Sequence, residues 1–243
     1  KKTSYRVKSK GWVSFLINDV MGVNQGGVAS GLLFRKYMAD LGNYLKSECG
    51  VCIGDIIIMH LLWADDLILI SDTALGLQKQ LDGLLKFCSK NLTTVNEIKT
   101  KCMTFGNIKT VELFFNHKLI EQVEQYKCLG NIIRSTVRFN EDIFSYNYPY
   151  LCQQSRKAIF GIQRRTRNVG VLPPKITMYM FNALVKPILV YGSEVWGTSK
   201  AGLSEIDKLF LRFARCTLKV KATTSNTIVY GELGCMPPSV FCY

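Results

Sequence analysis

The sequence predicts an α+β fold in which the first part mixes short strands with helices and the last part is helical throughout. Aliphatic and β-branched runs of strand length, separated by turn residues, recur through residues 1–142. Between them lie longer segments whose apolar residues recur every three or four positions, as on one face of a helix. From about Asp142 onward only the helical pattern continues, so we expect one domain over residues 1–142 and another over 143–243.

The composition indicates a folded protein that binds an acidic polymer. A chain of 243 residues that is 48% hydrophobic and 20% charged suits one large domain or two small ones. Its 31 Lys and Arg against 18 Asp and Glu leave a net charge of +13. This favours nucleic acid as the partner and, second, an anionic membrane surface. No apolar run suits a membrane-spanning helix, and no secretory signal follows the basic first residues. We expect an intracellular protein of the nucleus or cytoplasm, neither secreted nor membrane-inserted.

The cysteines indicate reduced thiols rather than a disulfide framework. There are nine, an odd number, and most lie in apolar surroundings. Cys49 and Cys52 form a C-x-x-C pair, but a tetrahedral zinc ion needs two more ligands, and no second pair has suitable spacing. We therefore expect no zinc.

The first residues predict a hairpin, a loop and a helix, in that order. Weak alternation across residues 5–21, interrupted by Lys10 and Gly11, predicts the hairpin. Residues 22–27 are rich in glycine and predict the loop. An apolar periodicity over residues 32–45 predicts the helix.

Two adjacent acids, Asp65 and Asp66, lie between aliphatic runs at residues 56–62 and 67–70. This pattern predicts a buried strand, a tight turn that carries both acids, and a return strand. Adjacent carboxylates repel each other in a partly desolvated site unless a cation neutralises them. Mg²⁺ suits that purpose because it prefers hard oxygen ligands. The pair is therefore either a magnesium site or merely a polar turn.

The remaining elements are short strands and longer helices. A helix capped by Ser71 or Asp72 should end near Asn91. Short strands are expected at residues 101–105, 114–115 and 126–130, and helices at 150–165, 174–196 and 203–219. Pro187 should kink the second of these helices. At the start of the third, Ser204 and Asp207 resemble a capping box.

Several of these segments together resemble the motifs of reverse transcriptases. Trp63-Ala64-Asp65-Asp66 resembles the family's aromatic-Ala-Asp-Asp box, and residues 22–30 resemble its glutamine-glycine loop. Asn96-x-x-Lys99-Thr100-Lys101 is similar to the lysine motif, and residues 126–130 are similar to the primer-grip strands. Residues 184–196 and 230–234 resemble segments typical of LINE-type retrotransposons in particular. The order and spacing agree over nearly the whole chain.

The resemblance implies a partial polymerase palm, an antiparallel sheet backed by helices, over residues 1–142 and an all-helical thumb-like region over 143–243. It implies RNA-directed DNA synthesis, with an RNA template and a DNA primer or hybrid as partners and Mg²⁺ as cofactor. In such enzymes two metal ions activate the primer 3′ hydroxyl and stabilise the leaving pyrophosphate. By resemblance, Asp65 and Asp66 would hold metal, Lys99 would stabilise the leaving phosphates, Gln25, Gly26 and Gly27 would line the template and nucleotide pocket, and Tyr126, Leu129 and Gly130 would be primer-grip-like.

Two basic clusters in the helical part are expected to follow a nucleic-acid backbone. The first, the α-helical stripe, recurs at spacings of four, three and four on one predicted helix and consists of Lys208, Arg212, Arg215 and Lys219. The residues that fall largely on another face of that helix should pack inside: Ile206, Leu209, Phe210, Phe213 and Thr217. The second cluster contains Arg156, Lys157, Arg164, Arg165 and Arg167. The alternative for both clusters is an ordinary solvated helix surface.

The sequence departs from the family pattern at positions that bear on activity. The family's first catalytic Asp lies on a strand well upstream of the glutamine-glycine loop, whereas only 24 residues precede Gln25 and Asp19 has the wrong context. The fingers are not recognised, and Asn24, Gly31 and Trp63 replace the usual Arg, Pro and Tyr or Phe. We therefore expect a truncated copy of a polymerase domain that is inactive alone. The alternatives are a non-catalytic nucleic-acid-binding remnant and a degenerate fragment.

Overall fold

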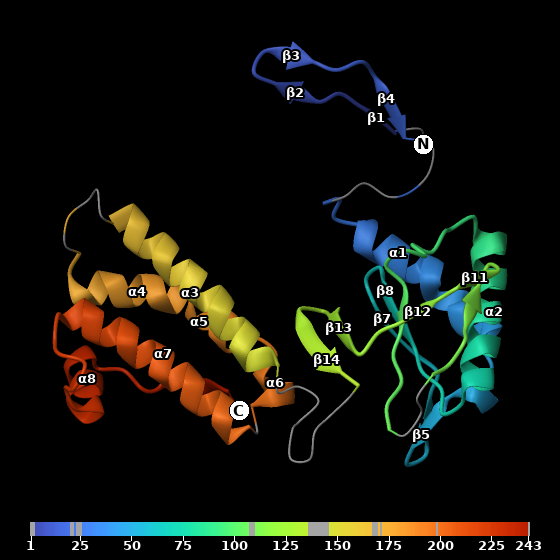
Figure 1. Ribbon diagram of the computed structural model, residues 1–243. Coiled ribbons are helices and arrows are strands. Elements are labelled where there is room, and N and C mark those ends of the chain that lie inside the picture. The colour runs from blue at the N-terminus through green and yellow to red at the C-terminus, as the bar shows by residue number, and fades with distance from the viewer. Residues whose placement is uncertain are drawn as a thin grey trace. The chain divides into compact units, whose positions relative to one another are not determined.

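The chain forms two compact units, Lys1–Thr100 with Val111–Glu121, and Lys101–Thr110 with Gln122–Tyr243. The computed structural model describes residues 3–19, 22, 26–106, 110–135, 146–166, 170, 172–197 and 199–242. The α+β class is as predicted: short antiparallel strand pairs alternate with helices in the first unit, and helices make up most of the second (Figure 1). The predicted boundary near Asp142 falls outside the described residues.

The N-terminal segment forms the predicted hairpin. Lys10 and Gly11 make its turn with φ angles of 44° and 88°. Two positive values suit the two-residue turn that matches the twist of paired strands. Ser9 pairs with Trp12 beside this turn. The strands are β1 (Thr3–Tyr5), β2 (Lys8–Ser9), β3 (Trp12–Val13) and β4 (Ile17–Asp19), and β1 pairs with β4.

The helix expected over residues 32–45 is observed in two parts. α1 (Ser30–Met38) begins slightly earlier than expected, and the 3₁₀ helix η1 (Ala39–Tyr44) continues it. Leu41 is fully buried, and η1 contacts the helix α2 described below. A second 3₁₀ turn, η2 (Ser47–Cys49), follows. The tighter part of this helix is therefore the part that contributes to the core.

Residues 51–69 form two successive hairpins instead of one long strand with its return. β5 (Val51–Ile53) pairs with β6 (Ile56–Ile58), and β7 (His60–Trp63) pairs with β8 (Asp66–Leu69). Gly54 and Asp55 make the turn of the first hairpin, and a Gly-Asp pair is a hairpin signal that was not used in the prediction. The prediction of a buried strand is wrong, because half or more of the surface of several apolar side chains is exposed, for example 50% for Leu61. Each ladder has only two strands among the described residues, and α2 contacts the second hairpin through β8.

Helix α2 (Ala74–Asn91) is the central helix of the first unit. Thr73 caps it, rather than Ser71 or Asp72: its hydroxyl accepts the Gly76 N–H at 3.0 Å. The helix ends at Asn91, as predicted. Its buried positions include Gln80, Leu81, Leu84, Phe87 and Cys88. α2 contacts β8, so this helix packs against the hairpin of the two acids.

A further hairpin in the first unit is attached to α2 through one side-chain amide. It consists of β10 (Phe114–Phe115) and β11 (Lys118–Leu119). Gln78 Oε1 accepts the Phe114 N–H at 2.8 Å, and Gln78 Nε2 donates to the Phe114 carbonyl at 2.9 Å. The amide thus satisfies both backbone groups of this residue, as a neighbouring strand would.

The second unit contains a strand hairpin followed by helices. β13 (Gln125–Cys128) pairs with β14 (Asn131–Arg134). β9 (Lys101–Cys102) is shorter than the strand predicted over residues 101–105, and β12 (Glu121–Gln122) lies where the chain passes between the units. After Arg134 no strand occurs among the described residues.

The C-terminal helices follow the predicted order with different boundaries. The predicted helix over 174–196 is interrupted at Val185, two residues before Pro187, and again at Gly192, which has φ 68°. Figure 1 shows α3, α4 and α7 packed together, and the three helices contact one another pairwise. The helices are α3 (Asn147–Thr166), α4 (Pro174–Leu184), α5 (Lys186–Leu189), α6 (Ser193–Trp196), α7 (Lys200–Leu218), α8 (Asn226–Leu233) and the 3₁₀ helix η3 (Pro238–Phe241). Helix α8 was not predicted.

Aromatic side chains form the centre of this helical core. The Phe181 ring lies 5.2 Å from Phe210 and 4.8 Å from Phe213, centroid to centroid. Trp196 is fully buried. The predicted inner face of α7 is confirmed for its four large apolar residues, which are buried: Ile206, Leu209, Phe210 and Phe213. The fifth predicted position, Thr217, is only half-buried.

The predicted capping box of α7 is wrong. The helix starts four residues before Ser204, and the Ser199 hydroxyl caps it by accepting the Gly202 N–H at 3.3 Å. Asp207 instead accepts hydrogen bonds from the backbone N–H and the hydroxyl of Ser239, at 3.0 and 2.6 Å. The carboxylate therefore binds a segment distant in sequence, a partner that a local motif does not reveal.

Candidate functional site

The two acids lie at the tip of hairpin β7–β8, as predicted. Trp63 pairs with Asp66, so Ala64 and Asp65 make a two-residue turn between them. Ala64 has φ 51°, a positive value of the kind that the first position of a type II′ turn requires. Positive φ is unfavourable for a residue with a Cβ, so the local backbone is strained at this turn. Asp65 therefore lies in the turn, and Asp66 is the first residue of the strand that follows it.

Both carboxylates are exposed to solvent, which corrects the expectation of a partly desolvated site. Water therefore reduces their mutual repulsion and no cation is needed to hold the turn together. Neither carboxylate bonds to another residue in the described part of the chain. Within the described ranges no group of three His, Cys, Asp or Glu side chains could hold a metal ion. The hairpin thus offers two hard oxygen donors, a set that suits Mg²⁺ but does not complete its coordination.

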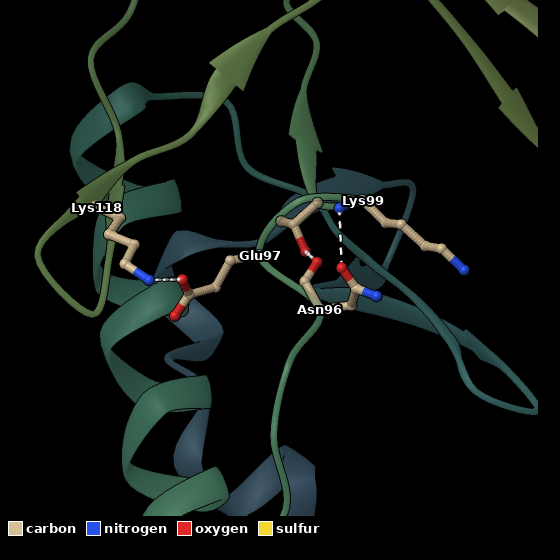
Figure 2. A network of polar contacts seen from close by, with 5 residues as sticks. Asn96, Glu97, Lys99 and Lys118 are labelled. Carbon is tan, nitrogen blue, oxygen red and sulfur yellow. Dashed lines mark hydrogen bonds and ion pairs between the residues drawn. The ribbon is translucent and has the colours of Figure 1, made fainter.

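Lys99 lies at the end of a short turn that Asn96 organises (Figure 2). The Asn96 side-chain oxygen and backbone carbonyl both accept the Lys99 N–H at 3.1 Å, and the carbonyl also accepts the Thr100 hydroxyl at 2.9 Å. Glu97 forms an ion pair with Lys118 at 2.5 Å, which ties the turn to β11. The hydrogen bond from Lys118 lowers the pKa of the Glu97 carboxyl. In Figure 2 the Lys99 side chain extends away from the Glu97–Lys118 pair.

The glutamine-glycine loop is described only in part. Gln25 lies outside the described residues, whereas Gly26 and Gly27 are exposed. Gly26 has φ 79°, and the Gly27 carbonyl accepts the Ser30 N–H at 3.1 Å where α1 begins. A Cβ added to Gly26 would meet nothing within 4 Å. Its glycine identity is therefore explained by the positive φ and not by close packing.

The primer-grip-like residues lie in hairpin β13–β14 of the second unit, with Tyr126 in strand β13 and Leu129 and Gly130 in the turn. Leu129 and Gly130 have φ angles of 46° and 84°, so they make a two-residue turn of the same kind as Lys10 and Gly11. Leu129 and Tyr126 remain 41% and 40% exposed. By contrast, Asp65, Asp66 and Lys99 belong to the first unit, as do Gly26 and Gly27 of the glutamine-glycine loop.

The α-helical stripe is used partly inside the protein. Arg215 donates to the Thr224 carbonyl at 2.8 and 3.2 Å and to Asn226 Oδ1 at 2.6 Å, and so binds the start of α8. Lys219 is the exposed C-cap of α7, with φ 56°. Arg212 is exposed. Only part of the predicted stripe is therefore available to a partner.

One acid, Glu205, lies among the cations of α7 and α3. Lys208 Nζ donates to Glu205 Oε1 at 2.9 Å, and this bond is the main cause of the lowered pKa of the Glu205 carboxyl. Arg156 on α3 and Arg212 lower the pKa further through their charge. The two helices contact each other, so cations from both clusters gather around a single carboxylate.

The second basic cluster lies on the outer face of α3. Arg156, Lys157, Arg164 and Arg165 are exposed, and so is Phe160, at 57%. Arg167 is outside the described residues. Exposed cations beside an aromatic ring can contact both phosphates and bases of a nucleic acid.

Cys49 and Cys52 do not form a compact pair on one surface. Cys49 is buried in η2, whereas Cys52 is exposed in β5. No helix among the described residues has the length and apolar character needed to cross a bilayer.

Several contacts of the site were not foreseen from the sequence. These are the Glu97–Lys118 ion pair and the contacts of Asn147 and Tyr191 with hairpin β13–β14, given below. The resemblance of residues 184–196 to LINE-type segments implied no role for Tyr191. A contact between residues far apart in sequence has no local signal, so no pattern could have shown these partners.

Comparison with known proteins identifies the class. The sequence profile of the family described as reverse transcriptase (RNA-dependent DNA polymerase) matches residues 3–133, which is more than half of the chain. The chain therefore belongs to the reverse transcriptase family.

The relatives lie among retrotransposons of the LINE type, which lack long terminal repeats. The chain is 38% identical over 218 residues to the Pol polyprotein of type-2 retrotransposable element R2DM of Drosophila melanogaster, covering 84% of this chain and 19% of that protein. It is 26% identical over 207 residues to the RNA-directed DNA polymerase of mobile element jockey of Drosophila funebris, covering 82% and 22%. For the type-1 element R2 of Bradysia coprophila the identity is 22% over 221 residues, covering 90% and 25%. The chain thus spans about a fifth to a quarter of the length of these relatives.

Proposed function

We propose that this chain is the part of an RNA-directed DNA polymerase that carries the acidic hairpin of the palm and a thumb-like region. In this proposal residues 1–142 are palm-like and residues 143–243 are thumb-like. The observation that carries it is the turn of β7–β8, which holds Asp65 and Asp66 exposed at the end of a paired ladder. Its partners are an RNA template and a DNA primer or hybrid.

The two carboxylates would hold Mg²⁺, which when bound supplies the Lewis-acid stabilisation that nucleotidyl transfer requires. The backbone geometry of the chain determines where this charge is placed. The Ala64 turn sets the backbone positions of both acids, and α2 contacts strand β8 of their ladder. The Asn96 turn holds the Lys99 backbone in place, and from this position the Lys99 ammonium would neutralise phosphate charge.

Binding of the nucleic acid is assigned to the exposed cations of α3 and α7. They attract phosphates regardless of sequence, which is what a polymerase needs as it moves along a template. The chain alone should bind without catalysis, because the described part brings only two carboxylates to the hairpin. A non-catalytic binding role is therefore the second candidate for the isolated chain.

A manganese titration followed by NMR tests the acidic hairpin. Paramagnetic Mn²⁺ should broaden the amide signals of residues 63–67, and Asp65→Asn with Asp66→Asn should abolish the effect. Asp55 provides an internal control, because it is a lone exposed acid in the turn of the adjacent hairpin β5–β6. Equal broadening at both turns, or broadening that survives the double substitution, would refute a metal-binding role for the pair.

A primer-extension assay tests the activity of the chain. With Mg²⁺, a primed RNA template and all four deoxynucleotides, the chain alone should give no extension, since half of a two-metal site lacks most of the charge stabilisation. Template-dependent extension that disappears in Asp65→Ala would show that the chain is catalytic as it stands.

A further inference from the structure

One side chain from the helical part reaches the tip of hairpin β13–β14. The Tyr191 hydroxyl donates to the Leu129 carbonyl at 2.6 Å, across 62 positions of sequence. Leu129 is the first of the two turn residues. Both groups belong to the second unit. The hydroxyl therefore binds the backbone of the turn itself and not the strands behind it.

The Tyr191 ring also determines the space available to the turn. A Cβ added to Gly130 would lie 2.8 Å from Cε1 of that ring, closer than real side chains approach. Gly130 also has φ 84°, which a residue with a Cβ rarely adopts. The turn thus fits beneath the ring only because its second residue is glycine.

The Tyr191 backbone is held from the other side by the residues that follow it. Trp196 is fully buried, and its Nε1 donates to the Tyr191 carbonyl at 2.9 Å. Gly192 has φ 68°, and a Cβ there would lie 2.5 Å from Asn131 Oδ1. The Tyr191–Trp196 segment, defined by residues 191–196, is therefore anchored in the helical core and pressed against both Gly130 and Asn131.

The ladder of the same hairpin is tied to α3 at the Lys127–Ile132 pair, one pair behind the turn. Asn147 Oδ1 accepts the Ile132 N–H at 2.5 Å, and Asn147 Nδ2 donates to the Ile132 carbonyl at 3.2 Å. Lys127 Nζ donates to the Tyr150 hydroxyl at 2.6 Å. The turn and the adjacent part of the ladder are therefore both hydrogen-bonded to the helical part of this unit.

We propose that Tyr191 is a positioning residue that sets the Leu129–Gly130 turn at the primer terminus, and that this is the role of the Tyr191–Trp196 segment. The proposal rests on the proposed function in one respect, namely that this turn meets the primer. Packing alone would not require the arrangement, because the turn keeps Leu129 41% exposed and Tyr191 49% exposed. The helical part then determines where the turn stands against the primer.

The substitution Tyr191→Phe isolates the hydroxyl, because the ring that packs on Gly130 stays. Tyr179→Phe is the matched control, since Tyr179 is a 74% exposed tyrosine on α4. Hydrogen exchange in residues 128–131 should become about fivefold faster in Tyr191→Phe, the change expected for one lost hydrogen bond. The control should exchange like the wild type. Unchanged exchange in Tyr191→Phe would overturn the positioning role.

The fluorescence of a base analogue at the primer 3′ end tests the role at the primer. It should not change in Tyr191→Phe if the Tyr191–Leu129 hydrogen bond only stabilises the fold. The probe is 2-aminopurine at the 3′ terminus of a DNA primer annealed to RNA. Binding of the wild type should change its fluorescence, and Tyr191→Phe should at least halve that change while the affinity for the hybrid stays the same. An unaltered signal together with faster exchange would overturn a role at the primer. If the wild type gives no 3′-end signal, the proposed primer contact fails, and the exchange measurement still decides whether Tyr191 positions the turn.

Discussion

Substitution of Arg215 by Gln separates a structural role from a nucleic-acid contact. The spacing of the α-helical stripe predicts that Arg215 faces a phosphate backbone. In the structure its guanidinium donates to the Thr224 carbonyl and to Asn226 Oδ1, and joins the end of α7 to the start of α8. Glutamine keeps helix propensity but is too short and too weak a donor to replace this fork. We therefore expect Arg215→Gln to reduce stability more than binding.

The size of the effect follows from the bonds that are lost. Hydrogen bonds that involve a charged group contribute about 1.5–3 kcal/mol each. Arg215 is half-buried and the bond to Asn226 is exposed, so water replaces part of the loss. A net destabilisation of about 2 kcal/mol is then reasonable, which corresponds to a fall in Tm of about 6 °C for a unit of this size.

Arg212→Gln is the matched control, because Arg212 lies on the same helix one turn earlier and is exposed. It should leave Tm unchanged. It should also make the slope of log K against log salt concentration shallower by about 0.9, the value for one phosphate contact. Thermal unfolding followed by circular dichroism gives Tm for both variants. Fluorescence anisotropy with an RNA–DNA hybrid at several salt concentrations gives the slope.

The opposite pattern would refute this reasoning. If Arg215→Gln keeps the wild-type Tm but loses about 0.9 of the slope, Arg215 is a phosphate contact and the bonds to the α7–α8 connection carry little energy. If Arg212→Gln leaves the slope unchanged, Arg212 is ordinary solvated surface and not a phosphate contact.

Three further measurements test other parts of the structure. Glu205→Gln should strengthen hybrid binding, because it removes a carboxylate that lies among the cations of α3 and α7. Since the pKa of Glu205 is lowered, the wild type should gain this affinity only when the pH falls below the ordinary range for Glu. Iodoacetamide at pH 8 should modify exposed Cys216 well before Cys152, whose pKa is raised by burial, and mass spectrometry that finds equal rates would contradict the described core. Phe181→Ala should cost about 3–5 kcal/mol in denaturant unfolding, because the ring is fully buried against Phe213, and a loss below about 1 kcal/mol would mean that this core is not packed as described.

Features that depend on a few neighbouring residues were predicted well. The hairpin at Lys10 and Gly11, the acidic turn and the end of α2 at Asn91 all agree with the structure. In each case the controlling feature is local: a turn residue with positive φ, a pair of adjacent strands joined by a short turn, or a periodic apolar face. The order of the motifs also identified the family, because order and spacing are properties of the chain before it folds.

Predictions that required a partner elsewhere in the chain were wrong or incomplete. The sequence alone could not show that Asp207 binds Ser239 rather than capping α7. Burial of the strands around the acidic turn was overestimated, because apolar character shows what a strand can bury and not whether a second layer covers it.

The amino-acid sequence by itself determined most of the elements of this protein, the position of Asp65 and Asp66 at a hairpin turn, the family and the basic character of the helical part. Only the tertiary structure decided which of those groups remain available to a partner. Tyr191 reaches Leu129, and Arg215 reaches Asn226, through hydrogen bonds that exist only once distant segments are packed together. A side chain that satisfies a buried or half-buried backbone group is bound within the protein, whatever its charge or its place in a sequence pattern.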